Sequence, residues 1–157
     1  MEDDTRAKEG FELWTLLHEA YDIISRVRDS ELREAGISRI QSAVLFTVKT
    51  GIMPATPAAI SRCLIRKPHA VSRLLDRMQR QGLVKKVKDL ERKNMVRVVL
   101  TEKGEEAYCQ SMNNRDAILR VMLAISQPER NNLRAYLERL RDKGLEELGL
   151  KYYFPFP

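Results

Sequence analysis

The chain has 157 residues, of which 43% are hydrophobic and 32% charged, and its formal net charge is +6. A chain of this size can bury an ordinary core as one domain without disulfides or metal ions. Cys63 and Cys109 are far apart and lack ligand-like neighbours, which argues against a zinc site and fits a reducing compartment. The N-terminus lacks a signal-peptide core, and no apolar run reaches the ~20 residues that span a bilayer. We therefore expect a soluble cytoplasmic protein with no membrane partner and no cofactor.

Positive charge is concentrated in the middle of the chain. Residues 61–103 contain thirteen Lys or Arg and four acidic residues, a net charge of +9, which leaves −3 for the rest. This distribution is typical of a protein in which one region binds a polyanion while the remainder serves folding or self-association. The alternative is a solvated basic face, because Lys and Arg populate every protein surface.

The first third of the chain has helical periodicity. Residues 1–8 are charged and aperiodic, which predicts a flexible tail. Over 9–35 the apolar residues cover two neighbouring helical faces, and this width predicts a helix that packs both on its own domain and on a partner. Gly36 interrupts the pattern, and Ser38 then precedes a second helix that ends at Gly51.

Two further helices follow, joined by a tight turn. Thr56 and Pro57 are an N-cap and a first-position proline, and the short helix PAAISRCL begins there. After a turn at 65–67, Pro68 opens a longer helix that ends at Gly82. This spacing is typical of a helix-turn-helix, in which the second helix enters the major groove with its N-terminal residues nearest the bases. The outward face of that helix carries His69, Ser72, Arg73, Asp76, Arg77 and Arg80.

Apolar and polar residues alternate after the second helix of this unit. The alternation predicts two strands, over 83–88 and 95–100, that form a hairpin with a charged tip at 89–94. Directly after a recognition helix, such a tip is placed to reach the DNA backbone or the minor groove.

The last part of the chain is again helical. Thr101 is the N-cap of one long helix over 101–125, whose first turn is acidic as the helix dipole favours. Ser126 and Glu129 then form the capping box of a final helix that carries an apolar stripe. The aromatic tail after it contains two prolines and cannot extend that helix.

Three stretches of the chain resemble the MarR family of winged helix-turn-helix transcriptional regulators. They are ISRIQSAVLF at 37–46, HAVSRLLDRMQRQGLV at 69–84 and VVLTEKG at 98–104. With the helix order, the resemblance covers nearly the whole chain. It implies a mainly α fold with a small β-hairpin wing, arranged as a single domain over 1–157. The winged-helix DNA-binding lobe would be 36–100, and the dimerisation helices and tail would be 9–35 and 101–157.

The resemblance also implies a function. Members of this family are homodimers that read pseudo-palindromic double-stranded DNA, and many are repressors that release DNA on binding a small, often aromatic, ligand between the dimer region and the lobe. The alternative is a winged helix that makes only protein contacts, because a fold does not fix a function. The sequence contains no nucleophile with a nearby base, no phosphate-binding glycine loop and no metal-ligand spacing, which argues against an enzyme.

The candidate DNA-binding residues lie in the helix-turn-helix and the wing. We expect the start of the second helix to face bases or adjacent phosphates and Arg77 to contact the backbone, unless these arginines instead pair with Asp76 or other surface acids. The wing departs from the family, since Arg92 and Asn94 stand where an Asp-x-Arg pattern is usual. Asp89 or Glu91 remain candidates for the missing carboxylate, and Arg92 or Lys93 for the minor-groove contact. The full set is Thr56, Lys67, Pro68, His69, Ser72, Arg73, Arg77, Arg92, Lys93 and Asn94.

Four single residues have simpler interpretations. Cys63 and Cys109 are predicted to be packed small residues rather than redox switches. His18, in the apolar first helix, is predicted to lie in a core or an interface, with a pH switch as the alternative. His69 is a single histidine at a helix start, and we assign no metal to it.

Overall fold

A computed structural model describes residues 2–51, 54–88 and 95–151 of the chain. Within these ranges the fold is mainly helical with one two-stranded antiparallel sheet, which confirms the predicted fold class. The elements are α1 (Glu2–Glu34), α2 (Arg39–Thr50), α3 (Pro57–Cys63), α4 (Pro68–Arg80), β1 (Val84–Val87), β2 (Arg97–Leu100), α5 (Glu102–Asn113), α6 (Asp116–Met122) and α7 (Gln127–Glu147).

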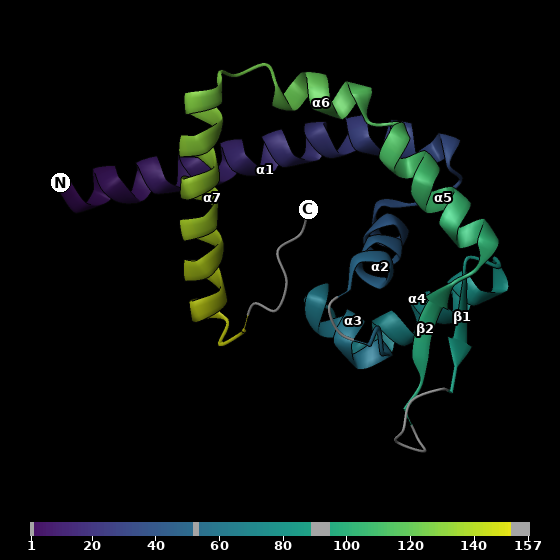
Figure 1. Ribbon diagram of the computed structural model, residues 1–157. Coiled ribbons are helices and arrows are strands. Elements are labelled where there is room, and N and C mark those ends of the chain that lie inside the picture. Colours follow the sequence, from purple (N-terminus) through teal and green to yellow (C-terminus); the bar gives the residue numbers. More distant parts are fainter. Residues whose placement is uncertain (1, 52–53, 89–94, 152–157) are drawn as a thin grey trace.

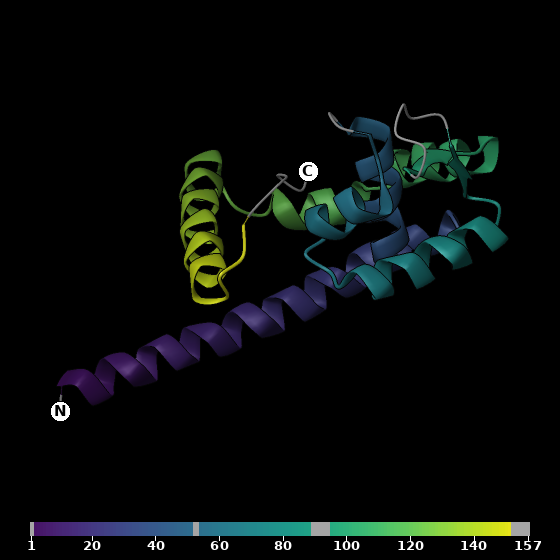
Figure 2. The same ribbon diagram turned by 90° about the horizontal axis from the view of Figure 1, so that it is seen from below.

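The elements form a compact lobe with two helical arms. Helices α2, α3 and α4 and the β1–β2 hairpin gather below the C-terminal half of α1, whereas α5 and α6 lie above them (Figure 1). The N-terminal half of α1 and the whole of α7 extend away from this lobe (Figure 2). Within the described ranges, none of the helices combines the length and the apolar character needed to cross a membrane.

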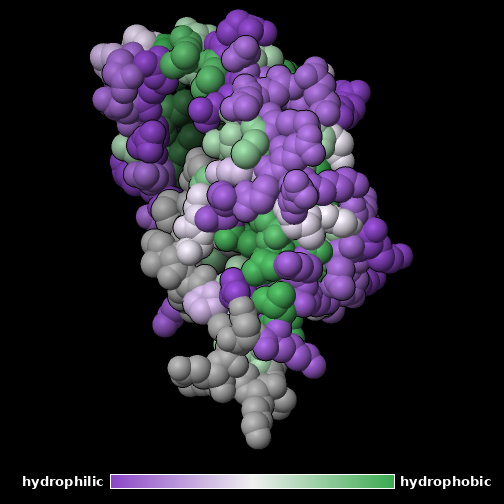
Figure 3. Space-filling view, turned by 45° about the vertical axis from the view of Figure 1, so that its right-hand side comes forward, coloured by the Kyte–Doolittle hydropathy of each residue, from purple (hydrophilic) through white to green (hydrophobic). Residues whose placement is uncertain are grey.

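The hydrophobic core lies in the lobe. Its most buried side chains come from α2, α3, α4 and both strands, and Leu32 joins them from the end of α1. Each fully buried aliphatic side chain contributes about 1.5–3 kcal/mol. Hydrophilic side chains cover most of the face in the space-filling view, with hydrophobic strips between them (Figure 3). The core members below 2% exposure include Val44, Leu45, Ile60, Val71, Leu75, Met78, Val84 and Val98.

The first helix is longer than the sequence predicts. Helix α1 begins at Glu2, so residues 2–8 are helical and the expected tail over 1–8 is corrected. Arg6, Ala7 and Lys8 have good helix propensity, and acidic residues are favourable near a helix N-terminus. Lys8 also lies 3.9 Å from the carboxylate of Glu12 one turn later. A charged segment without apolar periodicity can thus continue a helix that is already nucleated.

The predicted single helix over 101–125 is wrong, because the chain breaks between α5 and α6. Asn114 has φ −90° and ψ 78° and ends α5, and Arg115 precedes the first residue of α6. Two adjacent asparagines precede the break, and asparagine has a low helix propensity.

Contacts with α1 compensate for the backbone groups that this break exposes. The carboxylate of Glu31 accepts the N–H groups of Ala117 (2.7 Å) and Ile118 (3.1 Å) at the start of α6. The guanidinium of Arg28 donates to the carbonyls of Asn114 (2.8 Å) and Ser111 (2.7 Å) and to Glu31 (3.1 Å). Glu31 is 6% exposed, so this network fixes α6 on α1 from inside the fold.

The hairpin is short and its register is defined. Val84 pairs with Leu100 and Val87 with Arg97, so each strand has four residues, fewer than the predicted six. The N–H of Val98 also donates to the carbonyl of Ala55 (2.9 Å), which ties the hairpin to the segment before α3. The predicted wing residues Arg92, Lys93 and Asn94 lie outside the described residues, as do most of the residues of the aromatic tail.

Candidate nucleic-acid interface

Helix α3 begins at the predicted cap. The hydroxyl of Thr56 accepts the N–H of Ala59 (3.1 Å), and Pro57 occupies the first helical position. Thr56 is half-buried, and its hydroxyl satisfies one of the free N–H groups of the helix end. The structure therefore gives Thr56 a capping role, while its contact with DNA stays a prediction.

The turn between α3 and α4 is closed by paired backbone hydrogen bonds. The N–H of Ile65 donates to the carbonyl of Arg62 (3.2 Å), and the N–H of Arg66 donates to the carbonyl of Ser61 (3.0 Å). The hydroxyl of Ser61 donates in turn to the carbonyl of Arg66 (2.6 Å). This pattern is a Schellman closure, and it places Ile65 in the left-handed region with φ +49°. The closed turn fixes where α4 begins relative to α3.

Helix α4 has one buried face and one exposed face. Val71, Leu74, Leu75 and Met78 face the core, at the spacing of successive helical turns. Pro68 starts the helix, and its fixed φ suits that first position. The exposed face carries the predicted residues together: Lys67, Pro68, His69, Ser72, Arg73 and Arg77.

The arginines of this exposed face are not neutralised by the acid beside them. The carboxylate of Asp76 accepts a hydrogen bond from Lys86 of β1 (2.6 Å), and its main-chain carbonyl accepts one from Arg80 (3.5 Å). Among the described residues, the side chains of Arg73 and Arg77 have no hydrogen-bond or ion-pair partner. The alternative in which Asp76 neutralises these arginines is therefore wrong, and their guanidinium groups remain available to a polyanion.

The base of the hairpin is anchored to the end of α4 by the start of α5. The hydroxyl of Thr101 donates to the carbonyl of Gly82 and accepts the N–H of Gly104 (3.0 Å). The N–H of Thr101 donates to the carbonyl of Leu83 (3.2 Å). Gly104 lies so close to Leu83 that a Cβ there would be 1.9 Å from the Leu83 carbonyl oxygen. The residues LTEKG thus position the wing relative to α4, and the glycine makes the close approach possible.

Polar side chains tie α2 to both α4 and α5. The amide of Gln41, which is buried, donates to the side-chain oxygen of Gln81 at the end of α4 (2.6 Å). Lys49 donates to the carboxylate of Glu105 (2.8 Å), and this hydrogen bond raises the pKa of Lys49. Helix α2 therefore holds the end of α4 in a fixed orientation to α5.

Sequence reasoning missed part of the basic surface around the recognition helix. Arg66 lies in the α3–α4 turn, and Lys85 and Lys88 lie on or just after β1, all three exposed. Each belongs to the basic segment 61–103, but none of them lies on the outward face of the helix that begins at Pro68. Together these residues extend the positive surface from the turn to the hairpin.

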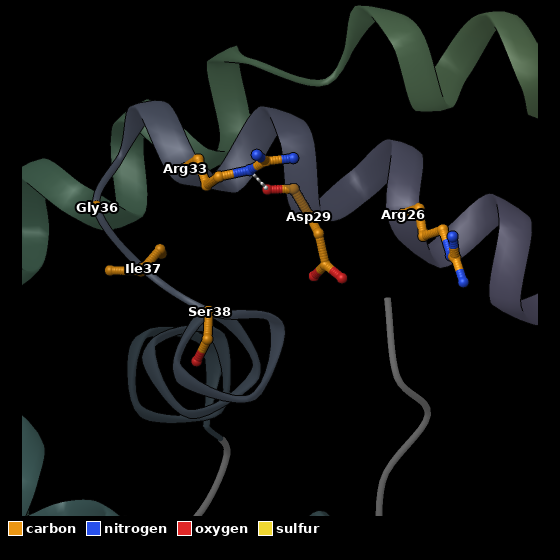
Figure 4. A pocket seen from close by; sticks show the side chains of 6 residues that line it. All are labelled: Arg26, Asp29, Arg33, Gly36, Ile37 and Ser38. Atoms are coloured by element: carbon orange, nitrogen blue, oxygen red, sulfur yellow. Dashed lines mark hydrogen bonds between the residues drawn. The ribbon is translucent and has the colours of Figure 1, made fainter.

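A cavity of about 490 Å³ lies between the end of α1 and the start of α2. Arg26, Asp29 and Arg33 line it from successive turns of α1, and Figure 4 shows Arg33 lying along the helix, where its Nε donates to the main-chain carbonyl of Asp29 (3.4 Å). The carboxylate of Asp29 accepts a hydrogen bond from Arg39 (2.8 Å) at the start of α2. Within the described part of the chain, no cluster of His, Cys, Asp or Glu side chains could hold a metal ion. The remaining lining residues are Gly36, Ile37 and Ser38.

The two arms expose large hydrophobic side chains. On α1, Trp14 is 59% exposed and stacks on His18 with ring centroids 6.0 Å apart. His18 is itself exposed in the single chain and lies 3.7 Å from Asp22, so its predicted place in a core is wrong and its place in an interface stays a prediction. On α7, Tyr136 is 57% and Leu140 50% exposed. An apolar surface of this extent is typical of a face that binds a partner.

The two cysteines differ in environment. Cys63 is buried in α3, as predicted, and burial raises the pKa of its thiol. Cys109 is exposed on α5, which contradicts its predicted packing role.

Comparison with known proteins agrees with this architecture. A family model described as "MarR family" matches residues 35–93. The ligand-free organohalide-sensing transcriptional regulator RdhR has a TM-score of 0.82 and 28% sequence identity to this chain, covering 94% of this chain and 89% of that one. The chain is therefore similar to the MarR family over residues 35–93 and to the regulator RdhR over most of its length.

Two further structures share the MarR-family fold. A cysteine-to-serine variant of MarR from E. coli, complexed with operator DNA, has a TM-score of 0.76 and 23% identity, covering 84% of this chain and 95% of that one. MepR from S. aureus, in a DNA complex, has a TM-score of 0.74 and 19% identity, covering 82% of this chain and 96% of that one. A sequence comparison with curated proteins finds no match.

Proposed function

We propose that this protein is a DNA-binding transcriptional regulator of the MarR family in which α4 enters the major groove of duplex DNA. The observation that carries the proposal is the exposed face of α4, where Arg73 and Arg77 have no acidic partner among the described residues. Arginines in this setting bind phosphates or guanines and release condensed counterions. The fold shared with the DNA complexes of MarR and MepR supports the same role.

The proposal includes a homodimer built from α1, α5, α6 and α7. Its support is the apolar surface on the arms, which a single chain leaves open to water. In the proposed dimer, α7 of each copy would cover α1 of the other, since an isologous interface uses the same surfaces on both subunits. Such a dimer presents two α4 helices to half-sites about one helical turn, roughly 34 Å, apart.

We further propose that the regulator is a repressor released by a small aromatic ligand in the cavity between α1 and α2. Arg26 and Arg33 supply positive charge and Ile37 an apolar wall, which suits a phenolate or an aromatic carboxylate. The cavity lies where the dimerisation helix meets the lobe, so a bound ligand would change the angle between them. The relative RdhR has a 2,4-dichlorophenol-bound form.

Selection of bound duplexes from a random pool tests the DNA-binding proposal. The wild-type protein is expected to enrich a two-fold symmetric consensus, because two copies of α4 read equivalent half-sites. A variant carrying both Arg73→Ala and Arg77→Ala is the control, and it is expected to fold normally and enrich nothing. No enrichment by the wild-type protein would overturn the proposal and favour a module that makes only protein contacts.

Thermal unfolding with added 2,4-dichlorophenol or benzoate tests the ligand proposal. Binding to the folded state raises the melting temperature by an amount that grows with the ratio of ligand concentration to the dissociation constant, and Arg26→Gln is expected to reduce that shift. If a ligand raises the melting temperature equally in the variant and leaves the DNA complex intact, the cavity is not a release site.

A further inference from the structure

Four of the helices in the described ranges end in the same kind of closure. In each, the residue after the C-cap has positive φ, and its N–H donates to the carbonyl of the residue three positions earlier. The N–H of the next residue donates to the carbonyl of the residue five positions earlier. Gly36, Gly82 and Gly149 occupy this position after α1, α4 and α7, with φ of +65°, +74° and +62°. After α3 the position is held by Ile65, with φ +49°.

An isoleucine is an unfavourable residue for this position. A left-handed backbone brings Cβ close to the following carbonyl, and the second branch at Cβ of isoleucine makes the crowding worse. Glycine has no such contact, and the three other closures of this chain use it. Folding alone therefore favours glycine at position 65, and the hydrogen bonds of Ser61 and Arg66 across the turn hold the backbone in place despite the side chain.

The Ile65 side chain is not fully buried, so burial does not offset the unfavourable energy of its left-handed backbone. It is 42% exposed, whereas its neighbour Leu64 is 8% exposed. The residues around it in the chain, Arg62, Arg66 and Lys67, are exposed and basic. Helix α4 starts three residues later, on the side of the lobe away from α5 and α6 (Figure 1). An apolar side chain thus protrudes from the part of the surface that is best suited to a polyanion.

We propose that Ile65 is a DNA-contacting residue whose side chain packs against apolar groups of the bound DNA, either the thymine methyl group or deoxyribose carbons. Duplex DNA offers both beside the phosphates that the basic neighbours would bind. This inference rests on the proposed DNA-binding function. It assigns to the turn before the recognition helix an apolar contact that the arginines of α4 cannot make.

Two variants distinguish the contact of the Ile65 side chain with DNA from the effect of its left-handed backbone on stability. Ile65→Gly and Ile65→Asn both tolerate the left-handed backbone and both remove the apolar side chain. Each is expected to bind a duplex selected by the wild-type protein roughly tenfold more weakly. The salt dependence of affinity is expected to stay the same, because no phosphate contact is lost. Thermal stability is expected to equal or exceed that of the wild type. The control is Gly149→Asn, at a left-handed position of α7 with open space around it, which should leave DNA affinity unchanged.

Uracil substitution distinguishes the two apolar groups. If Ile65 contacts a thymine methyl group, replacing that thymine with deoxyuridine weakens binding of the wild-type protein but not of the variants. If it contacts deoxyribose, the variants lose affinity whatever the thymine content, and this also supports the proposal. Variants that bind the selected duplex as tightly as the wild type would overturn it. Failure of the wild-type protein to select any duplex would instead show that the proposed DNA-binding function is wrong.

Discussion

Replacement of Gly104 by alanine tests how the β1–β2 hairpin is joined to α4. A Cβ at this position would lie 1.9 Å from the carbonyl oxygen of Leu83 and 3.5 Å from the Cβ of Leu100. Real Cβ atoms essentially never lie within 3.0 Å of such an atom, so the start of α5 must move by at least about 1 Å from the segment that links α4 to β1.

The expected change in the free energy of unfolding is the balance of a destabilising and a stabilising contribution. Forced repacking of this kind costs about 1–3 kcal/mol, and the shift also strains the hydrogen bonds that Thr101 makes to Gly82 and Leu83. Alanine recovers up to about 1 kcal/mol through its higher helix propensity. We expect Gly104→Ala to lower the free energy of unfolding by about 2 kcal/mol, which corresponds to about 4–8 °C in melting temperature for a chain of this size.

Chemical and thermal unfolding at equal protein concentration measure this difference, since a dimer's stability depends on concentration. The matched control is Gly10→Ala in α1, where a Cβ would meet nothing within 4 Å, and this variant is expected to be as stable as the wild type or slightly more stable. DNA affinity should fall only for Gly104→Ala, because only that change displaces the hairpin. If Gly104→Ala is as stable as Gly10→Ala, the close approach of α5 to Leu83 is refuted.

Four further predictions concern α4, α1 and α7. Arg73→Ala is expected to weaken duplex binding by about 1–3 kcal/mol in an anisotropy titration without lowering the melting temperature, and unchanged affinity would remove this residue from the interface. Glu31→Ala leaves the partly buried Arg28 without a carboxylate partner and is expected to lower the free energy of unfolding by about 3 kcal/mol, with faster amide exchange at the start of α6. Unchanged amide exchange there would contradict the role of Glu31 in holding α6 on α1. The Ser126 hydroxyl and N–H hold the pKa of Glu129 below its ordinary value. The stabilisation is therefore present above the usual glutamate range and is lost as pH falls through the folded-state pKa. The gap in melting temperature between wild type and Glu129→Gln should close in acid, and a gap independent of pH would exclude the charge as its cause. Leu140→Asp is expected to shift the protein from dimer to monomer in light scattering, and an unchanged mass would exclude this face of α7 from the interface.

Much of the fold follows from local sequence signals. Thr56, Thr101 and Ser126 were predicted as helix caps, and each caps a helix in the structure. The alternation after Gly82 predicted the hairpin, and its two strands pair as expected. Such signals are readable because caps and period-two patterns act over a few residues.

The features that the sequence did not predict depend on contacts far along the chain. The break at Asn114 is stabilised by Arg28 and Glu31, more than eighty residues earlier. A β-branched residue such as Ile65 gives no sign of a left-handed backbone, because its intrinsic preference is the opposite. The alternative pairing of Arg73 with Asp76 failed because β1 brings Lys86 to that carboxylate.

The candidate interface was predicted in part. The face of α4 was readable from helical spacing, and the structure places its predicted residues side by side. Arg66 and Lys85 were missed because they lie outside that helix and join it only through the turn and the hairpin.

The salt dependence of duplex affinity tests most directly the proposal that this protein binds duplex DNA through α4. The selected duplex should bind with a logarithmic affinity that falls linearly with the logarithm of salt concentration, with a slope set by the number of phosphates neutralised. Arg77→Ala is expected to reduce that slope by about one per protomer. If the wild-type protein binds duplex DNA weakly and its affinity does not change with salt concentration, the proposed DNA-binding function is wrong.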